Sequence, residues 1–255
     1  MPQVKSIFRY LTKEHDKEQF KQSQCLITIS VGQQTHEGER FLSTVNLLNE
    51  SCASCIILMG DSLQRHTMAL IGSDTADSFY EPSIKEGDLW LERNKKYYSK
   101  LKTLKKILRW DTWLQHKNFI ETQNKILALI KKDPTYKAAF DNSIHEFITK
   151  YRARLTNPTK FNIERARQLG FNFILEECTA LCLWPELDCH FEAYPNLHNT
   201  AIQETWRHFI EPYHPNLLRA ITIGFRYAKP LKPQKFLCLE HEQHRPENMI
   251  KEMIT

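Results

Sequence analysis

The segment CLITISVGQQ, residues 25–34, and the later segment SCIILMG, residues 54–60, decide the fold. Within them, Leu26–Val31 and Cys55–Met59 are short apolar runs that each end at a glycine, which is typical of buried strands. The stretch between them, Gly38–Glu50, has a helical pattern. A strand–helix–strand order favours a parallel sheet with helices on its faces. The sequence therefore predicts an α/β, Rossmann-like fold.

The rest of the chain extends this alternation and adds a helical insertion. Helical patterns dominate from about Ser83 to Leu183, and new helices are expected at Asp133-Pro134 and Asn157-Pro158. After Pro185 the sequence predicts strands at Leu187–Ala193, Ala220–Phe225 and Lys235–Leu239, and a helix at Asn199–Ile210. We expect one domain over residues 1–255, with the helical, basic segment 83–183 inside it.

Composition sets broad limits on function. With 255 residues, 41% of them hydrophobic, the chain can bury a sizeable core. A net charge of +5 indicates a mild preference for anionic partners, and it does not distinguish tRNA from a phosphorylated metabolite. The first residues are charged throughout, and no apolar run of about 18 residues occurs, so we expect a cytoplasmic protein without a membrane segment. We also expect a monomer.

The seven cysteines are an odd number scattered through apolar segments, which favours reduced thiols over a disulfide framework. Cys52 and Cys55 form a CxxC pair, but no second CxxC or histidine pair lies at zinc-ligand spacing. The sequence therefore predicts no metal site.

The residues after the second predicted strand match part of an esterase motif, but the rest of that catalytic site is missing from the sequence. Residues 60–63 spell GDSL, the nucleophile block of a serine esterase family, but no Asp is followed three residues later by His. We therefore expect Asp61 or Ser62 to cap the next helix. Neither GxGxxG nor a P-loop follows the first strand, so no nucleotide cofactor is expected.

Residues His36–Glu39 read HEGE, where a class I aminoacyl-tRNA synthetase would carry its HIGH motif, and no KMSKS-like loop is present. A synthetase needs those groups to stabilise ATP phosphates during adenylation. If the protein uses an amino acid, the amino acid must arrive already activated, without ATP.

Three blocks together resemble the tRNA-dependent cyclodipeptide synthases: Ser30 after the first strand, FILEEC at Phe173–Cys178, and EAYP at Glu192–Pro195. The resemblance spans roughly Cys25 to Phe225. It implies a relative of the class I synthetase catalytic domain that joins two amino acids from charged tRNAs, without ATP or another cofactor.

The resemblance also implies roles for individual residues. Ser30 matches the nucleophile that holds the first aminoacyl group, and Tyr194 matches a catalytic tyrosine. Phe173 and Glu177 match an aromatic–glutamate pair that binds the substrate amino group, and their spacing puts both on one helix face. Glu176 is rotated about 100° and should face away, so its replacement by Gln is expected to be nearly neutral.

The subfamily follows from the residues around Ser30 and Tyr194. Gln33, three residues after the serine, and the pair Tyr194-Pro195 resemble the subfamily called XYP. Gln33 and Pro195 are therefore expected at the substrate. Phe173 lacks the hydroxyl of the tyrosine that the other branch carries, so another group would have to bond the substrate amine.

The chemistry expected for this site is acyl transfer. Ser30 would take the acyl group from the ester, with backbone N–H groups around Gly32 and Gln33 stabilising the oxyanion. The second aminoacyl-tRNA would present its amine to the seryl ester, giving a dipeptidyl-enzyme whose free amine closes the ring. Glu177 and Tyr194 are the candidate proton acceptors.

A tRNA-binding surface is expected within Arg93–Arg109, which holds many lysines and no acidic residue. Read as one helix, it has an apolar face of Tyr97, Leu101, Leu104 and Leu108, and an opposite basic stripe of Lys95, Lys102, Lys106 and Arg109. Two other functions stay open. A serine hydrolase would need Ser30 without tRNA, and a non-enzymatic tRNA-binding module would need the stripe without Ser30.

Overall fold

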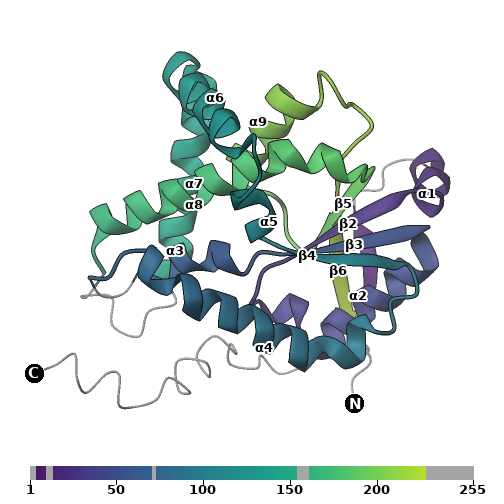
Figure 1. Cartoon of the computed structure of the whole chain (residues 1–255). Helices are drawn as coiled ribbons and strands as arrows, with labels where there is room; N and C mark the ends of the chain where they lie inside the picture. Colours follow the sequence, from purple (N-terminus) through teal and green to yellow (C-terminus); the bar gives the residue numbers. More distant parts are fainter. Residues whose placement is uncertain (1–3, 10–13, 71–72, 154–160, 228–255) are drawn as a thin grey trace, which may run out of the picture.

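A computed structural model describes residues 4–9, 14–70, 73–153 and 161–227 as one six-stranded sheet with helices on both faces (Figure 1). The strand order is β1-β6-β5-β2-β3-β4. The strands are β1 (Val4–Arg9), β2 (Gln24–Ile29), β3 (Ser54–Met59), β4 (Leu104–Arg109), β5 (Phe191–Tyr194) and β6 (Arg219–Tyr227). Neighbouring strands are parallel except for β1 and β6, which are antiparallel.

The helices form two layers around this sheet. They are α1 (Glu14–Lys21), α2 (Gly38–Ser51), α3 (Arg65–Met68), α4 (Tyr80–Tyr98), α5 (Asp111–Leu114), α6 (Phe119–Lys132), α7 (Pro134–Arg152), α8 (Ile163–Leu183) and α9 (Thr200–Thr205). Short 3-10 turns lie at Gln34–His36, Ser62–Gln64, Asp77–Phe79 and Trp184–Leu187, and a π-helical turn follows α9 at Trp206–Ile210.

Alternating side chains of the central strands separate the two layers of core. Leu26, Ile56 and Leu58 are buried in the cluster formed with α5 to α9. Cys25 and Ile57 point to the other face, where the cluster includes residues of α1, α2 and α4. Because parallel strands are buried on both faces, β2 and β3 read as continuous apolar runs in the sequence.

The fold predicted from the sequence is confirmed in class and in most of its elements. The predicted strands around Leu26–Val31 and Cys55–Met59 and the helix between them are β2, β3 and α2. Asp133 caps α7 as expected, because its Oδ1 accepts the backbone N–H groups of Thr135 and Tyr136 at 2.8 and 3.2 Å. The predicted helix at Asn199–Ile210 and the strand at Ala220–Phe225 also exist, as α9 with its π-helical turn and as β6.

Some predicted elements differ in position or lie outside the described residues. β5 begins at Phe191 rather than Leu187, because Leu187 ends a 3-10 turn and Asp188 adopts a left-handed conformation. The antiparallel edge strand β1 was not predicted. The strand expected at Lys235–Leu239 and the helix start expected at Asn157-Pro158 lie outside the described residues.

The helix predicted across Arg93–Arg109 is wrong. Helix α4 ends at Tyr98, and the chain turns and enters β4, which pairs with β3. The register shifts between Cys55 and Ile56 of β3, and Leu104 and Leu108 of β4 pack into different core layers. Partly buried apolar residues on both faces and this irregularity remove the strict alternation that identifies a strand in a sequence.

Because β4 lies at one edge of the sheet, its lysines can protect that edge from pairing with other strands. Lys105 and Lys106 are exposed there, and charged side chains on an edge strand oppose pairing with another chain.

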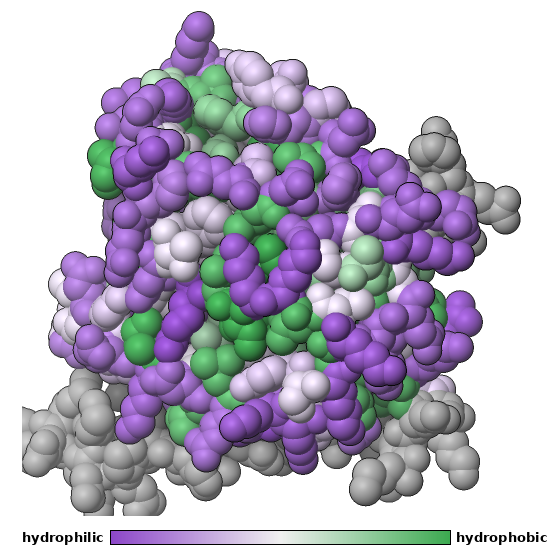
Figure 2. Space-filling model, turned by 45° about the vertical axis from the view of Figure 1, so that its right-hand side comes forward, coloured by the Kyte–Doolittle hydropathy of each residue, from purple (hydrophilic) through white to green (hydrophobic). Residues whose placement is uncertain are grey.

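In the space-filling view, hydrophilic residues cover most of the visible surface and hydrophobic residues show mainly in the middle (Figure 2). Among the described residues, none of the helices has the length and apolar character needed to cross a membrane.

Candidate active site

The site lies where the direction of the chain connections reverses. β2 lies between β3 and β5 and runs parallel to both. The chain leaves β2 through α2 on one face of the sheet, and it reaches β5 through helices on the other face. Such a point opens a crevice at the carboxyl ends of the strands. Ser30 directly follows β2, and Tyr194 ends β5.

Ser30 and Tyr194 meet across this crevice, with 2.9 Å between Ser30 Oγ and the Tyr194 hydroxyl oxygen. A tight turn fixes the serine, since the Gln33 N–H donates to the Ser30 carbonyl at 3.1 Å. Gly32 stands third in this turn with φ of 81°, a conformation that glycine adopts at little cost. The hydroxyl is therefore presented on a fixed backbone.

His36 stabilises the same turn through a contact with the backbone of Ser30. The Ser30 backbone N–H donates to His36 Nδ1 at 2.9 Å, and the Ser30 carbonyl lies 3.2 Å from the same nitrogen. Burial lowers the pKa of His36 to about 4, so the ring is neutral. The indole of Trp90 donates to the His36 carbonyl at 3.0 Å, and Glu37 bonds Asn94 at 2.7 Å. In the sequence His36 belonged only to a synthetase-like motif, and its role in placing Ser30 was missed.

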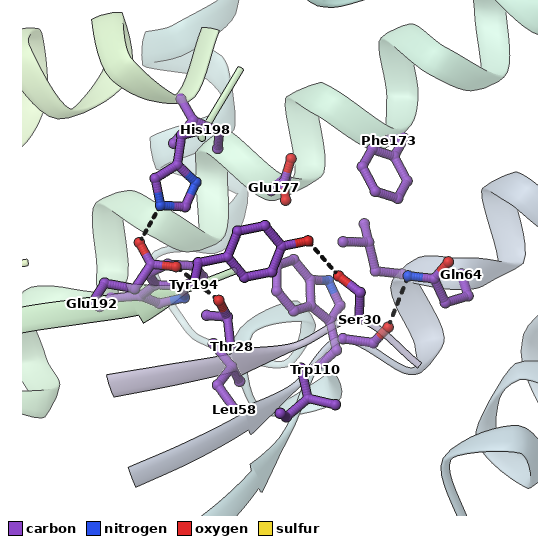
Figure 3. Close-up of a pocket in the computed structure, with 15 residues that line it drawn as sticks. Thr28, Ser30, Leu58, Gln64, Trp110, Phe173, Glu177, Glu192, Tyr194 and His198 are labelled. Carbon is purple, nitrogen blue, oxygen red and sulfur yellow. Dashed lines mark hydrogen bonds and ion pairs between the residues drawn. The ribbon is translucent and has the colours of Figure 1, made fainter. Parts of the chain in front are cut away.

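Helix α8 provides the opposite wall. Phe173 and Glu177 both line a cavity of about 50 Å³ that also contains Ser30 and Tyr194, which confirms that they share one face. In the close-up, both side chains point from α8 toward the serine and the tyrosine (Figure 3). The remaining lining residues are Thr28, Ile29, Leu58, Gly60, Leu63, Gln64, Trp110, Trp184, Glu192, His198 and Ile202.

Two groups in the cavity have strongly shifted pKa values. Burial raises the pKa of Glu177 to about 7; nearby His198 and Lys150 oppose this rise, and Glu192 adds to it. Burial also raises the pKa of Tyr194 to about 12, so its hydroxyl stays protonated at neutral pH. A carboxyl group whose pKa is close to neutral pH and a fixed phenol beside a serine are suited to proton transfer.

Glu176 faces away from the cavity as predicted, but it is not a neutral position. It is 5% exposed, forms an ion pair with Arg65, and accepts hydrogen bonds from Trp110 Nε1 at 2.8 Å and from His66 Nε2, whose donor assignment depends on the tautomer, at 3.2 Å. Replacement by Gln would leave the buried Arg65 without its carboxylate. These contacts argue against the expectation of a nearly neutral effect and favour a loss of stability.

Two further lining residues, Glu192 and His198, were not predicted to act in the site. They form an ion pair of 2.9 Å beside Tyr194. Glu192 appeared in the sequence only as part of the EAYP block. His198 stands in a polar stretch after β5 and carried no signal that would distinguish it from a loop histidine.

Three of the predicted substrate-binding residues are not among those that line the cavity: Gly32, Gln33 and Pro195. The backbone N–H of Gln33 donates to the Ser30 carbonyl, so the prediction that it stabilises an oxyanion is wrong for this conformation. The proposed contribution of Gly32 stays a prediction.

The four basic residues do not form one stripe. Lys95 lies in the last turn of α4, Lys102 in the following turn and Lys106 on β4, all three exposed. Arg109 instead forms ion pairs of 2.5 Å with both Asp61 and Asp88. Since Lys102 precedes β4, it lies at the amino end of the parallel strands, away from the carboxyl end where Ser30 stands.

The GDSL residues are held in structural contacts. Asp61 provides no side-chain cap to the following turn and binds Arg109 and the backbone N–H of Trp110 instead. Ser62 Oγ donates to Asp111 at 2.5 Å. The capping prediction is therefore wrong for Asp61, and Ser62 is already engaged with a carboxylate rather than with a histidine.

The described cysteines are all free thiols: Cys25, Cys52, Cys55, Cys178, Cys182 and Cys189. Cys52 and Cys55 donate to the nearby carbonyls of Leu48 and Ile56. Cys238 lies outside the described part of the chain. Within the described ranges, no group of three or more His, Cys, Asp or Glu side chains is arranged to hold a metal ion.

Fold and site together define a Rossmann-like protein with a serine–tyrosine pair at the switch point of its sheet. A scan against protein-family models finds no match, and a search of curated proteins finds none either. Solved structures are similar. A CDPS (cyclodipeptide synthase) from Fluoribacter dumoffii is 36% identical with a TM-score of 0.85, and the match covers 89% of this chain and 100% of that one.

The chain belongs to the cyclodipeptide synthase family. A cyclodipeptide synthase from Candidatus Glomeribacter gigasporarum, solved bound to Phe-tRNAPhe, shares the fold at 18% identity and a TM-score of 0.73, over 90% of this chain and 99% of that one. A Mycobacterium tuberculosis protein, reported to demonstrate that cyclodipeptide synthetases are related to type I tRNA synthetases, matches with 12% identity and a TM-score of 0.57 over 86% of this chain and 92% of that one.

Proposed function

We propose that this enzyme makes a cyclodipeptide from two aminoacyl-tRNAs by ping-pong catalysis through Ser30. The observation that carries the proposal is the hydrogen bond of 2.9 Å between Ser30 and Tyr194 at the switch point, facing Glu177 across the cavity. The fixed turn, the phenol and a carboxyl group with a pKa of about 7 surround the place where an ester would lie.

In the first step, Ser30 Oγ attacks the ester carbonyl of one aminoacyl-tRNA. The bond to the ribose oxygen breaks, and the serine proton passes to that oxygen, so the step needs no co-reactant. The Tyr194 hydroxyl contacts Ser30 Oγ and is placed to relay this proton. Glu177, as a carboxylate, binds the α-ammonium group by a charge-assisted bond.

The order of attack in the second step follows from where the dipeptide must remain. If the amine of the second aminoacyl-tRNA attacked the seryl ester, as we first expected, Ser30 would be released and the dipeptide would stay on tRNA. A dipeptidyl-enzyme forms only when the amine of the seryl-bound residue attacks the second tRNA ester. The new terminal amine then attacks the seryl ester, closes the ring and regenerates Ser30.

Several further features belong to the same proposal. Gln33 and Tyr194-Pro195 support membership of the XYP subfamily. We further propose a single catalytic domain that acts as a cytoplasmic monomer without ATP. The exposed Lys95, Lys102 and Lys106 remain candidates for tRNA phosphates. Arg109 is a weaker candidate, because its guanidinium group is paired with two carboxylates.

The experiment that tests the function uses tRNA charged with a mixture of amino acids. Wild-type enzyme should consume charged tRNA and release a cyclic product, detected by mass spectrometry. Ser30→Ala should release none while keeping the fold and tRNA binding, because the acyl group has no acceptor. An ester on a peptide containing Ser30, trapped by acid quenching, would support the covalent step directly.

Ser62→Ala is the matched control, since Ser62 also lies near a strand end but bonds Asp111. It should retain acylation. Hydrolysis of small esters without tRNA would favour a serine hydrolase, and binding of tRNA without turnover would favour a binding module. A Ser30→Ala variant that still forms product would remove Ser30 from the nucleophile role.

A further inference from the structure

A buried ion pair in the cavity lies outside the serine, tyrosine and α8 glutamate of the proposed reaction. Glu192 on β5 is 3% exposed, and both of its oxygens are engaged. Oε1 accepts from Thr28 Oγ1 at 2.8 Å, and Oε2 lies 2.9 Å from His198 Nε2. Burying a carboxylate is costly unless it is paired, so the pair calls for an explanation.

The backbone that follows His198 is held at the start of α9. The next residue, Asn199, caps α9 by accepting the Ile202 N–H at 2.9 Å. The side chain of Gln203 donates to the His198 carbonyl at 2.7 Å. A histidine held in this way is positioned by the fold rather than by packing of its ring alone.

The imidazole stacks on the ring of Tyr194, with the ring centroids 5.5 Å apart and an angle of 13° between the planes. One ring nitrogen is bound to Glu192, and the other faces the side of the cavity where Glu177 lies (Figure 3). His198 therefore contacts or faces the two groups that the proposed reaction uses for proton transfer and amine binding.

Charge balance in the cavity depends on this histidine. The lining residues include two carboxyl groups, Glu177 and Glu192, and no Lys or Arg. Burial opposes protonation of His198, but the two carboxylates outweigh it and raise the pKa of the imidazole. The raised pKa favours the imidazolium form, which interacts with both carboxylates.

We propose that His198 is a positioning residue of this site: its imidazolium, held by Glu192, favours the ionised form of Glu177 that binds the substrate α-ammonium group and fixes the Tyr194 ring against Ser30. This inference rests on the proposed function. It assigns the Glu192–His198 pair a role that neither residue could fill alone. Without the histidine, Glu192 would lie beside Glu177 without its ion-pair partner.

The groups that face Glu177 decide the direction of the expected change. His198 and Lys150 of α7 lower its pKa, Asn199 lowers it by a hydrogen bond, and Glu192 raises it. Removing the imidazolium therefore raises the pKa of Glu177 further above 7, by about one unit for an opposite charge at close range. A protonated Glu177 no longer pairs with the ammonium group.

The test is His198→Gln, assayed for cyclic product from charged tRNA between about pH 6 and pH 8.5, with correction for spontaneous deacylation. We expect the acid limb of the pH–rate profile to move upward by about one unit, so that activity lost at pH 7 partly returns at pH 8.5. A histidine that only packs against Tyr194 would lower the rate equally at every pH, and that result would overturn the inference.

A second variant guards against misfolding. Glu192→Gln combined with His198→Gln removes both charges and keeps a pair of groups able to hydrogen-bond. Since His198 affects Glu177 more than Glu192 does, this variant should show a smaller shift in the same direction. A profile identical to that of the wild type in this folded variant would also contradict the proposal.

Carboxyl NMR titration separates this inference from the proposed function, because it needs no turnover. The Glu177 signal, assigned with Glu177→Gln, should titrate at higher pH in His198→Gln than in the wild type. If that shift occurs and the wild type makes no product, only the proposed function fails. If the wild type makes product and neither titration nor profile moves, only the present inference fails.

Discussion

Glu176 and Glu177 are neighbours on α8, yet they belong to two regions with opposite electrostatics. Glu176 lies in a closed cluster with Arg65, His66 and Trp110. Burial would raise its pKa, but the hydrogen bonds and charges of His66 and Arg65 outweigh this and lower it. Glu177 faces the cavity, where burial raises its pKa to about 7.

The difference shows that one carboxylate stabilises the fold and that its neighbour is free to take part in proton transfer. A fully partnered carboxylate is held ionised and fixes α8 against α3. A carboxylate with fewer partners stays close to its protonation midpoint and can bind or release a proton at neutral pH. Helical geometry separates the two roles with a single step of about 100°.

The largest expected effect tests the cavity side. Glu177→Gln removes the charge that binds the ammonium group, and we expect a loss of product formation of about 10²-fold or more. Steady-state rates with charged tRNA measure it. Glu164→Gln, at an exposed position in the first turn of the same helix, is the control and should be nearly unaffected. Equal rates in the two variants would break the comparison.

The next effect concerns the closed cluster. Glu176→Gln leaves Arg65 as a buried charge without its carboxylate, and we expect a loss of about 3–5 kcal/mol in the free energy of unfolding at pH 7.5. Chemical denaturation measures this loss. Replacing Arg65 and Glu176 together by Met should restore much of the stability, because no lone buried charge remains.

The pH dependence gives this second prediction a sign. The folded pKa of Glu176 is lowered, so its stabilisation is present above the unfolded value of 4.5 and is lost as pH falls through the folded value. The difference between Glu176→Gln and wild type should therefore shrink in acid. Glu177 behaves oppositely, since its raised pKa destabilises the fold as pH rises from 4.5 through about 7. Glu177→Gln should thus be no less stable than wild type at pH 8.

Sequence reasoning found the parts of this site that follow from local pattern. Ser30 comes at the end of an apolar run, and the four-residue spacing of Phe173 and Glu177 fixes their common face. It could not find His198 or the role of His36, because each contacts a residue six positions earlier across an irregular turn, which has no periodic sequence pattern. Nor could it place β4, whose partly buried leucines lie on both faces of the sheet and whose irregular register breaks the alternation of a strand.

The smallest effect extends the comparison from acids to bases, since Arg109 is closed in by Asp61 and Asp88 whereas Lys95 and Lys102 are exposed. If the two lysines contact tRNA phosphates, each contributes about 0.7 to 0.9 to the slope of log affinity against log salt. Lys95→Ala with Lys102→Ala should flatten that slope by roughly 1.5 and leave the product unchanged.

The control for this pair makes the same change in net charge at the opposite edge of the sheet, with Lys5→Ala and Lys21→Ala on β1 and α1. It should leave the salt slope as it is in wild type, because a general loss of charge differs from the loss of a phosphate contact. If both double variants flatten the slope equally, Lys95 and Lys102 act only through net charge. If neither does, Lys95 and Lys102 make no contact with tRNA phosphates, and tRNA binds elsewhere.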